Sequence, residues 1–326
     1  MKAVNSVPIS QDKINLGESA PISFPFLIHV EPSKYCNLKC EFCPNRLVDD
    51  SEKELMPIEI FEKTIAEMKE FPEKPRILKF CGVGEPLVNK ETPDMIKMAK
   101  EAGCADRIIM YTNGVLLSPE VNTKIVEGGL DQINISVEGI DDEGYMKFAG
   151  TKVDFDNLVA NVKDLYQKRK QLKVYVKVHN LAVPTNADKE KFYSIFGDIS
   201  DFISIEGISH IFYNYTSEGE ERIAHRYDRS DTSKWQVCAV CFKMLNVNAN
   251  GSVSACSVDW DRRVVVGNIN KESLVEIWNG ERIRDLRRRF CMGTIDKSEA
   301  CYDCSDYYLS GHENLDAYKD EIFARL

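Results

Sequence analysis

The sequence has no long hydrophobic run and no apolar core near its N-terminus. Of its 326 residues 43% are hydrophobic, but no stretch approaches the roughly 20 consecutive apolar residues of a membrane-spanning helix. Asp12, Lys13 and Glu18 interrupt the first two dozen residues, so a signal-peptide core is also lacking. We therefore expect a cytoplasmic protein.

The sequence is also short of basic charge. Its formal net charge is −10, whereas a surface that follows nucleic-acid phosphates needs clustered lysine and arginine. The arginine run at 287–289 is too short to change this. Internal repeats and low-complexity segments are absent as well. We expect neither nucleic acid nor membrane among the partners, and a chain long enough for one barrel-sized domain plus a smaller one.

Cysteine, in contrast, is abundant, with eleven residues in two main groups. Without an export signal, metal ligation is a better interpretation than disulfides. Cys36, Cys40 and Cys43 are spaced C-x3-C-x2-C, with Phe42 before the last. Three soft sulfur ligands are one fewer than a four-iron cluster binds, so one iron keeps an open position. A zinc knuckle is the alternative, although the nearest histidine, His29, precedes the loop on an expected strand.

The second group lies near the C-terminal end. A hairpin and a later turn place four thiols where they can converge, as a four-cysteine cluster requires. These are Cys238, Cys256, Cys301 and Cys304. A zinc ribbon uses similar pairs and is the alternative.

Hydrophobic periodicity predicts six strands that alternate with helices. The strands are expected at 25–30, 76–81, 107–111, 130–137, 173–178 and 202–205. The helices are expected at 57–71, 93–102, 119–127, 155–168 and 189–196, with a loop between the fourth strand and residue 155. Such alternation implies a parallel sheet with right-handed crossovers.

The pattern changes after a polar, charged stretch. Short strands are expected at 245–247, 252–255 and 264–266, with a turn at Asn250-Gly251 and a helix over 273–289. We predict five parts in the chain. These are an arm at 1–24, a barrel at 25–208, a linker at 209–234, a small cluster-binding domain at 235–310 and a C-terminal helix or tail at 311–326.

Polar residues follow the expected strands. The glycines of Gly82-Val83-Gly84-Glu85-Pro86 allow close approach to a ligand, and Glu85 offers an acceptor for an ammonium group. Ser136 and Glu138 share one face of the fourth strand and could meet a ribose, or form a polar strand end that faces solvent. Lys177 and His179 share one face of the fifth strand, and His179 could equally be a packed core residue.

The first cysteine loop resembles the cluster loop of the radical S-adenosylmethionine (SAM) superfamily. In that family the open iron chelates the amino and carboxylate groups of SAM, and an electron from the cluster splits SAM into methionine and a 5′-deoxyadenosyl radical. The resemblance covers about residues 25–308. It implies a partial (β/α)6 TIM barrel with a small C-terminal α+β domain, although a doubly wound open sheet has similar periodicity. A reductant such as flavodoxin or ferredoxin is the implied partner.

The resemblance also assigns cofactor-binding residues. The turn at 82–86 is similar to the family's GGEP motif, so Gly82, Gly84 and Glu85 are expected at the SAM amino group, although Val83 stands where the motif often has glycine. The resemblance implies further candidates around SAM. These are Phe42 in the cysteine loop, Asn113 in the turn after the third strand, Ser136 and Glu138 at the ribose, and Lys147 or Lys177 at the carboxylate.

The C-terminal segment resembles the SPASM and Twitch extensions, which carry auxiliary iron–sulfur clusters. The sequence at 266–269 and 274–279 is similar to their G-N-I…EIWN pattern. No cysteine follows Cys304, so we expect one auxiliary cluster, of 4Fe-4S or 2Fe-2S type. In these extensions the first cysteine ligand lies at a characteristic interval before a glycine, which here is Gly251. Cys238 lies at the commoner interval, but Cys241 also falls within the observed range of intervals. Cys241 and Cys291 are otherwise either inert, buried thiols or candidate hydrogen-atom donors to a substrate radical.

Three functions remain open at this point. The resemblance implies that a hydrogen is taken from carbon, which leads either to dehydrogenation or to epimerisation of a small molecule such as a sugar or aminocyclitol. A peptide-modifying or protein-modifying maturase is the alternative. The two dozen residues before the first strand are too few for a leader-binding winged helix, which favours the small molecule. The third possible function is that of a metal-binding protein without catalysis.

Overall fold

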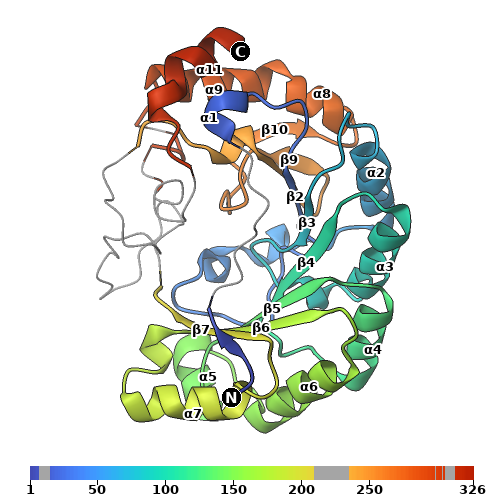
Figure 1. Ribbon diagram of the computed structural model, residues 1–326, viewed down its shortest axis with the longest axis vertical. Helices are drawn as coiled ribbons and strands as arrows, with labels where there is room; N and C mark the ends of the chain where they lie inside the picture. The colour runs from blue at the N-terminus through green and yellow to red at the C-terminus, as the bar shows by residue number, and fades with distance from the viewer. Residues whose placement is uncertain (7–14, 209–234, 298, 303, 305–312) are drawn as a thin grey trace.

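The computed structural model describes residues 1–6, 15–208, 235–297, 299–302, 304 and 313–326. The linker expected at 209–234 lies outside these residues. One curved sheet of ten strands runs through the molecule, in the order β1-β7-β6-β5-β4-β3-β2-β8-β9-β10, with helices over its convex side (Figure 1). Within the described part, β1 and β10 are the two edges of this open sheet.

The strands are short and evenly distributed along the chain. Their bounds are β1 (Val4–Asn5), β2 (Leu27–Val30), β3 (Ile77–Phe80), β4 (Arg107–Thr112), β5 (Gln132–Val137), β6 (Lys173–His179), β7 (Phe202–Glu206), β8 (Met244–Val247), β9 (Ser252–Ser254) and β10 (Val265–Asn268). The α-helices are α1 (Leu16–Ser19), α2 (Ile58–Met68), α3 (Thr92–Ala102), α4 (Pro119–Glu127), α5 (Asp142–Ala149), α6 (Phe155–Lys168), α7 (Asn186–Phe196), α8 (Leu274–Asn279), α9 (Glu281–Met292) and α11 (Lys319–Arg325).

The two faces of the sheet differ in chemistry because side chains alternate along each strand. Ile28 on β2 and Leu78 on β3 are fully buried and belong to the hydrophobic core. The next residue on each strand, His29 and Lys79, points to the opposite, concave face, and the two are register partners. Parallel sheets are usually apolar on both faces, so a polar concave face indicates a binding function.

The predicted fold class is confirmed. Strands β2 to β7 correspond to the six predicted strands, pair in parallel and form the curved sheet of a partial barrel. The expected small C-terminal domain contributes β8, β9 and β10 to the same sheet, because β8 pairs in parallel with β2. The predicted division into five parts stays a prediction, but the hydrogen-bonded sheet crosses its main boundary.

The segment expected as an arm contains regular structure, and two other local predictions were wrong. The arm at 1–24 contains α1 and also β1, which pairs with β7. The loop expected before residue 155 contains α5, whose N-cap Asp141 accepts a hydrogen bond from the backbone NH of Gly144. The single helix expected over 273–289 is two helices, α8 and α9, since Gly280 between them has an extended backbone with ψ 163°.

A buried ion pair fastens the C-terminal segment to the end of β2. The Arg262 guanidinium lies 2.9 Å from the Glu31 carboxylate and 2.7 Å from that of Glu54. Glu31 is 2% exposed and also accepts hydrogen bonds from the backbone NH groups of Val83 and Ala249. Arg262 adopts the left-handed conformation, with φ 58°. A buried carboxylate needs a counter-charge. The ion pair with Glu31 therefore offsets the free-energy cost of the left-handed backbone at Arg262.

We expect Arg262→Met to lower the free energy of unfolding by about 3 kcal/mol, because it leaves Glu31 buried without its cation. The double variant Glu31→Gln/Arg262→Met should recover much of this, since glutamine keeps an acceptor for Val83 and carries no charge. Lys124→Met, which breaks the exposed pair with Glu120, should change stability by less than about 1 kcal/mol. Urea titration of the three variants measures the effect, and equal losses for Arg262→Met and Lys124→Met would contradict it.

Candidate functional site

The first cysteine loop is held by the C-terminal end of α5. The backbone NH of Lys39 donates to the Ala149 carbonyl at 2.9 Å, and that of Glu41 donates to the Phe148 carbonyl at 3.2 Å. These carbonyls have no partner inside the helix because they belong to its last turn. The loop that the sequence singled out is therefore anchored by a helix that the sequence analysis did not predict.

The three thiols of this loop converge. Burial, together with the charges of Glu85 and Cys43, raises the pKa of Cys36 to about 12. Burial and the charge of Glu138 raise the pKa of Cys43 to about 11, and burial with the charges of Glu138 and both other cysteines raises that of Cys40 further. Thiols that oppose each other's ionisation in this way suit a shared cationic centre, which stabilises the thiolates. The donor set thus fits an iron–sulfur cluster.

The glycine-rich turn packs directly on this loop. A Cβ atom added to Gly84 would lie 2.3 Å from the Ser33 carbonyl oxygen and 2.5 Å from that of Tyr35. The NH of the next residue, Glu85, donates to the same Tyr35 carbonyl at 2.9 Å. Only glycine permits this approach, and it brings the turn against the residue that precedes Cys36.

Glu85 connects separate segments of the chain through hydrogen bonds. Its carboxylate accepts hydrogen bonds from the Thr112 hydroxyl at 2.7 Å, the Asn113 NH at 2.7 Å and the Leu87 NH at 3.0 Å. The carboxyl group is buried, and burial raises its pKa while these hydrogen bonds oppose the rise. Sequence analysis predicted Glu85 as an acceptor for an ammonium group. The structure gives both of its oxygens partners within the chain, so Glu85 also organises the turn.

Asn113 extends this network to the cysteine loop. Its side-chain NH2 donates to the side-chain oxygen Oδ1 of Asn37 at 2.8 Å and lies 3.9 Å from the Cys36 sulfur. The turn after β4 is thus linked to Glu85 through its backbone and to the cluster loop through its side chain. Asn113 was predicted at the cofactor, and the structure brings it to the loop that would hold the cluster.

Glu138, His179 and Phe42 form a second side of the site. The His179 ring packs edge-on against Phe42, with ring centroids 5.1 Å apart, and against Phe148 at 4.8 Å. His179 Nε2 lies 3.3 Å from the Glu138 carbonyl oxygen. Burial lowers the pKa of His179 to about 4, so the ring is neutral at pH 7. Burial raises the pKa of Glu138 to about 7 against the opposing charge of Lys177. His179 therefore packs between the cysteine loop and Glu138.

Lys177 and Lys147 differ in position. The Lys177 ammonium lies on the concave face, 3.0 Å from the Glu206 carboxylate, and Ser136 is its register partner on β5. Lys147 is exposed on α5, with its ammonium 4.7 Å from the centroid of the Phe148 ring. Their assignment to the SAM carboxylate, like that of Ser136 to the ribose, stays a prediction.

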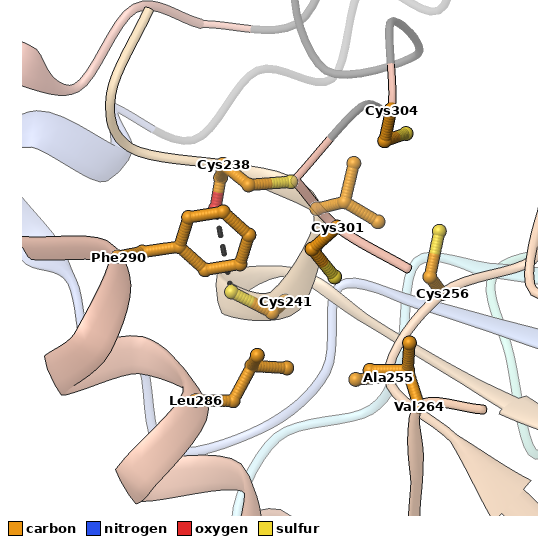
Figure 2. A pocket seen from close by; sticks show the side chains of 10 residues that line it. Cys238, Cys241, Ala255, Cys256, Val264, Leu286, Phe290, Cys301 and Cys304 are labelled. Atoms are coloured by element: carbon orange, nitrogen blue, oxygen red, sulfur yellow. Dashed lines mark hydrogen bonds between the residues drawn. The ribbon is translucent and has the colours of Figure 1, made fainter. Parts of the chain in front are cut away.

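The second cysteine group surrounds a single cavity (Figure 2). Its lining includes both the predicted ligands and one more cysteine: Cys238, Cys241, Cys256, Cys301 and Cys304. Leu286 and Phe290 of α9 close one side of the cavity (Figure 2). Burial and the charges of the other four thiols raise the pKa of Cys238. This donor set also fits a cluster.

The spare thiols have separate places. The Cys241 thiol donates to the Cys238 carbonyl at 3.3 Å (Figure 2), whereas Cys291 is buried on α9 and is not among the residues that line the cavity. All eleven cysteines lie in the described part of the chain and none forms a disulfide. Within this part, no three histidine, cysteine or acidic side chains are close enough to hold one metal ion. The predicted hydrogen-atom donation by Cys241 or Cys291 stays a prediction.

The structure adds residues that the motifs did not indicate. Glu31 follows directly after β2, a position at which a ligand-binding side chain is expected, but no sequence signal pointed to its partner Arg262. Cys81 lies between the two cysteine groups in the sequence. Its sulfur is 3.1 Å from Nδ1 of His29 on the concave face.

Comparison with known families and proteins agrees with this geometry. The model of the radical SAM superfamily matches residues 30–192, and that of SPASM, an iron–sulfur cluster-binding domain, matches residues 238–305. The S-adenosyl-L-methionine-dependent 2-deoxy-scyllo-inosamine dehydrogenase of Niallia circulans is 23% identical over 89% of this chain and 96% of its own. The AdoMet-dependent heme synthase of Methanosarcina barkeri (strain Fusaro) is 25% identical over 81% of this chain and 85% of its own.

Two solved structures share the fold. BtrN in complex with AdoMet and 2-DOIA has a TM-score of 0.56 at 20% identity and covers 90% of this chain and 97% of its own. The enzyme anSMEcpe, with bound AdoMet and a peptide, has a TM-score of 0.57 at 14% identity, with 92% and 95% covered. Among the described helices of this chain, none has the length and apolar character needed to cross a membrane.

We expect Gly84→Ala to lower the iron bound by the first cysteine group, because the added Cβ displaces the carbonyl of Tyr35 next to Cys36. In a background without the second group (Cys238, Cys256, Cys301 and Cys304 to alanine), iron per chain should fall several-fold and SAM binding with it. Val83→Ala, one residue away, is the control and should retain the iron of its parent. Unchanged iron in Gly84→Ala would contradict the proposed contact.

Proposed function

The chain belongs to the radical SAM superfamily, and we propose that it oxidises a hydroxyl group of a small polar molecule of the sugar or aminocyclitol class. The reaction begins with reductive cleavage of SAM at the cluster held by Cys36, Cys40 and Cys43. The 5′-deoxyadenosyl radical then takes a hydrogen atom from the carbon that bears the hydroxyl. Loss of the hydroxyl proton and of one electron completes a ketone. An auxiliary cluster held by Cys238, Cys256, Cys301 and Cys304 would supply the acceptor for this electron.

The observation that carries this proposal is the contact between the two cysteine-bearing segments. Arg262, six residues after Cys256, reaches Glu31 on the end of β2. Glu31 in turn accepts a hydrogen bond from Val83 in the turn assigned to SAM. The loop that follows Cys256 therefore ends beside the turn assigned to SAM. An electron acceptor beside the SAM site is what oxidation requires and what epimerisation does not.

The concave face of the sheet supports a small polar substrate. Its side chains carry hydroxyl, amide, ammonium and carboxylate groups: Lys79, Tyr111, Asn134, Ser136, Tyr175, Lys177, Ser204 and Glu206. The Lys79 ammonium lies 4.9 Å from the centroid of the Tyr111 ring. The Tyr175 hydroxyl donates to the Glu206 carboxylate. Groups of this kind recognise hydroxyl and amino substituents through hydrogen bonds.

Oxidation is favoured over epimerisation by the position of Cys241 and Cys291, the two thiols predicted as hydrogen-atom donors. An epimerase returns a hydrogen atom to the substrate carbon, which requires a thiol at the substrate. Cys241 hydrogen-bonds to the Cys238 carbonyl beside the second cluster site, and Cys291 is buried on α9. The full-length likeness to a dehydrogenase of an aminocyclitol supports the same choice.

Peptide modification is the second candidate, because the fold is equally similar to that of a relative solved with a peptide. This likeness concerns the fold alone. The polar concave face, with its paired charges of Lys177 and Glu206, suits a compact polyol better than an extended chain. The competing substrates are distinguished directly by assay.

Anaerobically reconstituted protein, incubated with dithionite, SAM and 2-deoxy-scyllo-inosamine, should form 5′-deoxyadenosine and the corresponding ketone in equal amounts. A return of deuterium-labelled or solvent hydrogen to the substrate carbon without ketone would instead indicate epimerisation. If 5′-deoxyadenosine forms but neither product appears with a panel of cyclitols and sugars, the small-molecule proposal fails. A reconstituted protein that never cleaves SAM would overturn the enzymatic function altogether.

We expect Cys40→Ala to abolish SAM cleavage, because it removes a ligand of the SAM-binding cluster. Cys301→Ala should keep a substantial part of the cleavage and lose ketone formation at least tenfold, since it removes a ligand of the auxiliary cluster only. Cys104→Ala is the control, as Cys104 is buried and donates to the Ala99 carbonyl away from both sites. Equal loss of SAM cleavage in Cys40→Ala and Cys301→Ala would contradict this division of roles.

A further inference from the structure

A buried guanidinium group lies beside the second cysteine cavity. Arg287 of α9 is 2% exposed. Its Nε donates to the Cys241 carbonyl at 3.0 Å and its Nη1 donates to the Trp278 carbonyl at 3.2 Å. Its Nη2 has no hydrogen-bond partner among the described residues. Arg287 is thus a cation enclosed in the core and only partly satisfied by neutral carbonyl groups.

Arg287 differs from three other arginines of α9 in having no acidic partner, and unlike Arg284, which also has none among the described residues, it is buried. Arg282 pairs with Glu272, Arg288 with Glu281 and Arg289 with Glu299. In the described part of the chain, no carboxylate lies within ion-pair distance of Arg287. A buried charge without a counter-charge is costly, so its retention needs a reason.

Aromatic rings supply part of the compensation. The guanidinium carbon lies 4.2 Å from the centroid of the Trp278 ring and 5.7 Å from that of Phe242. Such contacts attract a cation to the negative face of the ring. They stabilise the position of Arg287, but they do not neutralise its charge.

The nearest group that can carry negative charge is the Cys241 thiol. The charge of Arg287 lowers the pKa of Cys241 against the larger effect of burial, and the Cys241 charge raises the pKa of Arg287, again against burial. Cys241 lines the cavity together with four other cysteines. Four thiolates that hold an iron–sulfur cluster give this cavity a net negative charge, which the protein would otherwise leave uncompensated.

We propose that Arg287 is the counter-charge of the auxiliary cluster and holds its reduction potential at a higher value than the cavity would otherwise allow. The inference rests on the auxiliary cluster of the proposed function. Reduction adds one negative charge to the cluster, and a fixed cation nearby stabilises the reduced form more than the oxidised form. Because the group is buried, salt screens this interaction little. Arg287 thereby makes the cluster a better acceptor of the substrate's electron.

The first cysteine group has the opposite electrostatic surroundings. The buried carboxyl groups nearest its thiols are Glu85, which opposes ionisation of Cys36, and Glu138, which opposes that of Cys40 and Cys43. At the second group, Asp259 and Arg289 act on Cys301 in opposite directions, and Arg289 is already paired with Glu299. Among the described residues of this region, Arg287 is therefore a buried cation without an acidic partner, whereas the buried Asp259 carboxylate acts on Cys301 with the opposite sign.

Two substitutions separate charge from packing. Arg287→Gln removes the charge and keeps NH donors for the carbonyls of Cys241 and Trp278, whereas Arg287→Lys keeps the charge and loses the planar contact with Trp278. Both are made in a background with Cys36, Cys40 and Cys43 changed to alanine, so that only the auxiliary cluster gives a signal. Arg282→Gln, at an exposed position of the same helix, is the matched control.

The readout is the midpoint potential of the reconstituted holoprotein, followed by electron paramagnetic resonance during anaerobic redox titration. For Arg287→Gln we expect the equilibrium constant for reduction to fall about tenfold, which is a shift of about 59 mV to more negative potential for a one-electron couple. Arg287→Lys should shift by less than half as much, and Arg282→Gln should not shift.

The possible failures are distinguishable. If the background protein binds no cluster, both the auxiliary cluster and this inference are wrong. If it binds a cluster whose potential is the same with Arg287 and with glutamine, only the role of Arg287 is wrong. A lysine variant that shifts as far as the glutamine variant would assign the effect to packing and overturn the inference. If the glutamine variant does not fold, as judged by circular dichroism, an equal comparison of Arg287→Met and Arg287→Lys replaces it.

Discussion

The parallel pairing of β2 with β8 is the contact on which the rest of the structure depends. Strand β2 has β3 on one side and β8 on the other, so the strand that leads into the first cysteine loop also carries the segment with the second cysteine group. A radical reaction with two redox centres needs a constant relation between them. Shared backbone hydrogen bonds provide a rigid connection that a linker between separate domains does not.

Buried charged side chains lie near both cysteine groups. Buried carboxyl groups, Glu85 and Glu138, lie near the first group, and a buried guanidinium group, Arg287, lies near the second. Glu85 and Arg287 also stabilise the structure, because Glu85 accepts three hydrogen bonds and Arg287 donates to two carbonyls. The same side chains that hold the loops in place thus set the electrostatic environment of any cluster that the loops bind.

The sequence predicted the regular part of the fold well and its exceptions poorly. Period-two and helical patterns located β2 to β7, because each buries one strongly apolar face. Helix α5 was missed because it is only eight residues long and contains Gly144, although Asp141 as N-cap and Gly150 as a left-handed C-cap were signals for it. The cysteines were recognisable from spacing alone. Arg262 and Arg287 were not, since their roles depend on contacts with distant residues, which no local pattern encodes.

The anchoring of the first cysteine loop by α5 has a consequence for how the protein acquires its metal. The NH groups of Lys39 and Glu41 donate to carbonyls of α5, so contacts within the protein contribute to the shape of the loop independently of any metal. In small zinc-binding domains the metal supplies the folding energy, and its removal unfolds the chain. Here the cysteine loop has hydrogen bonds to α5 that require no metal. Because these two bonds use only backbone groups, we expect loss of the iron to leave the loop anchored to α5.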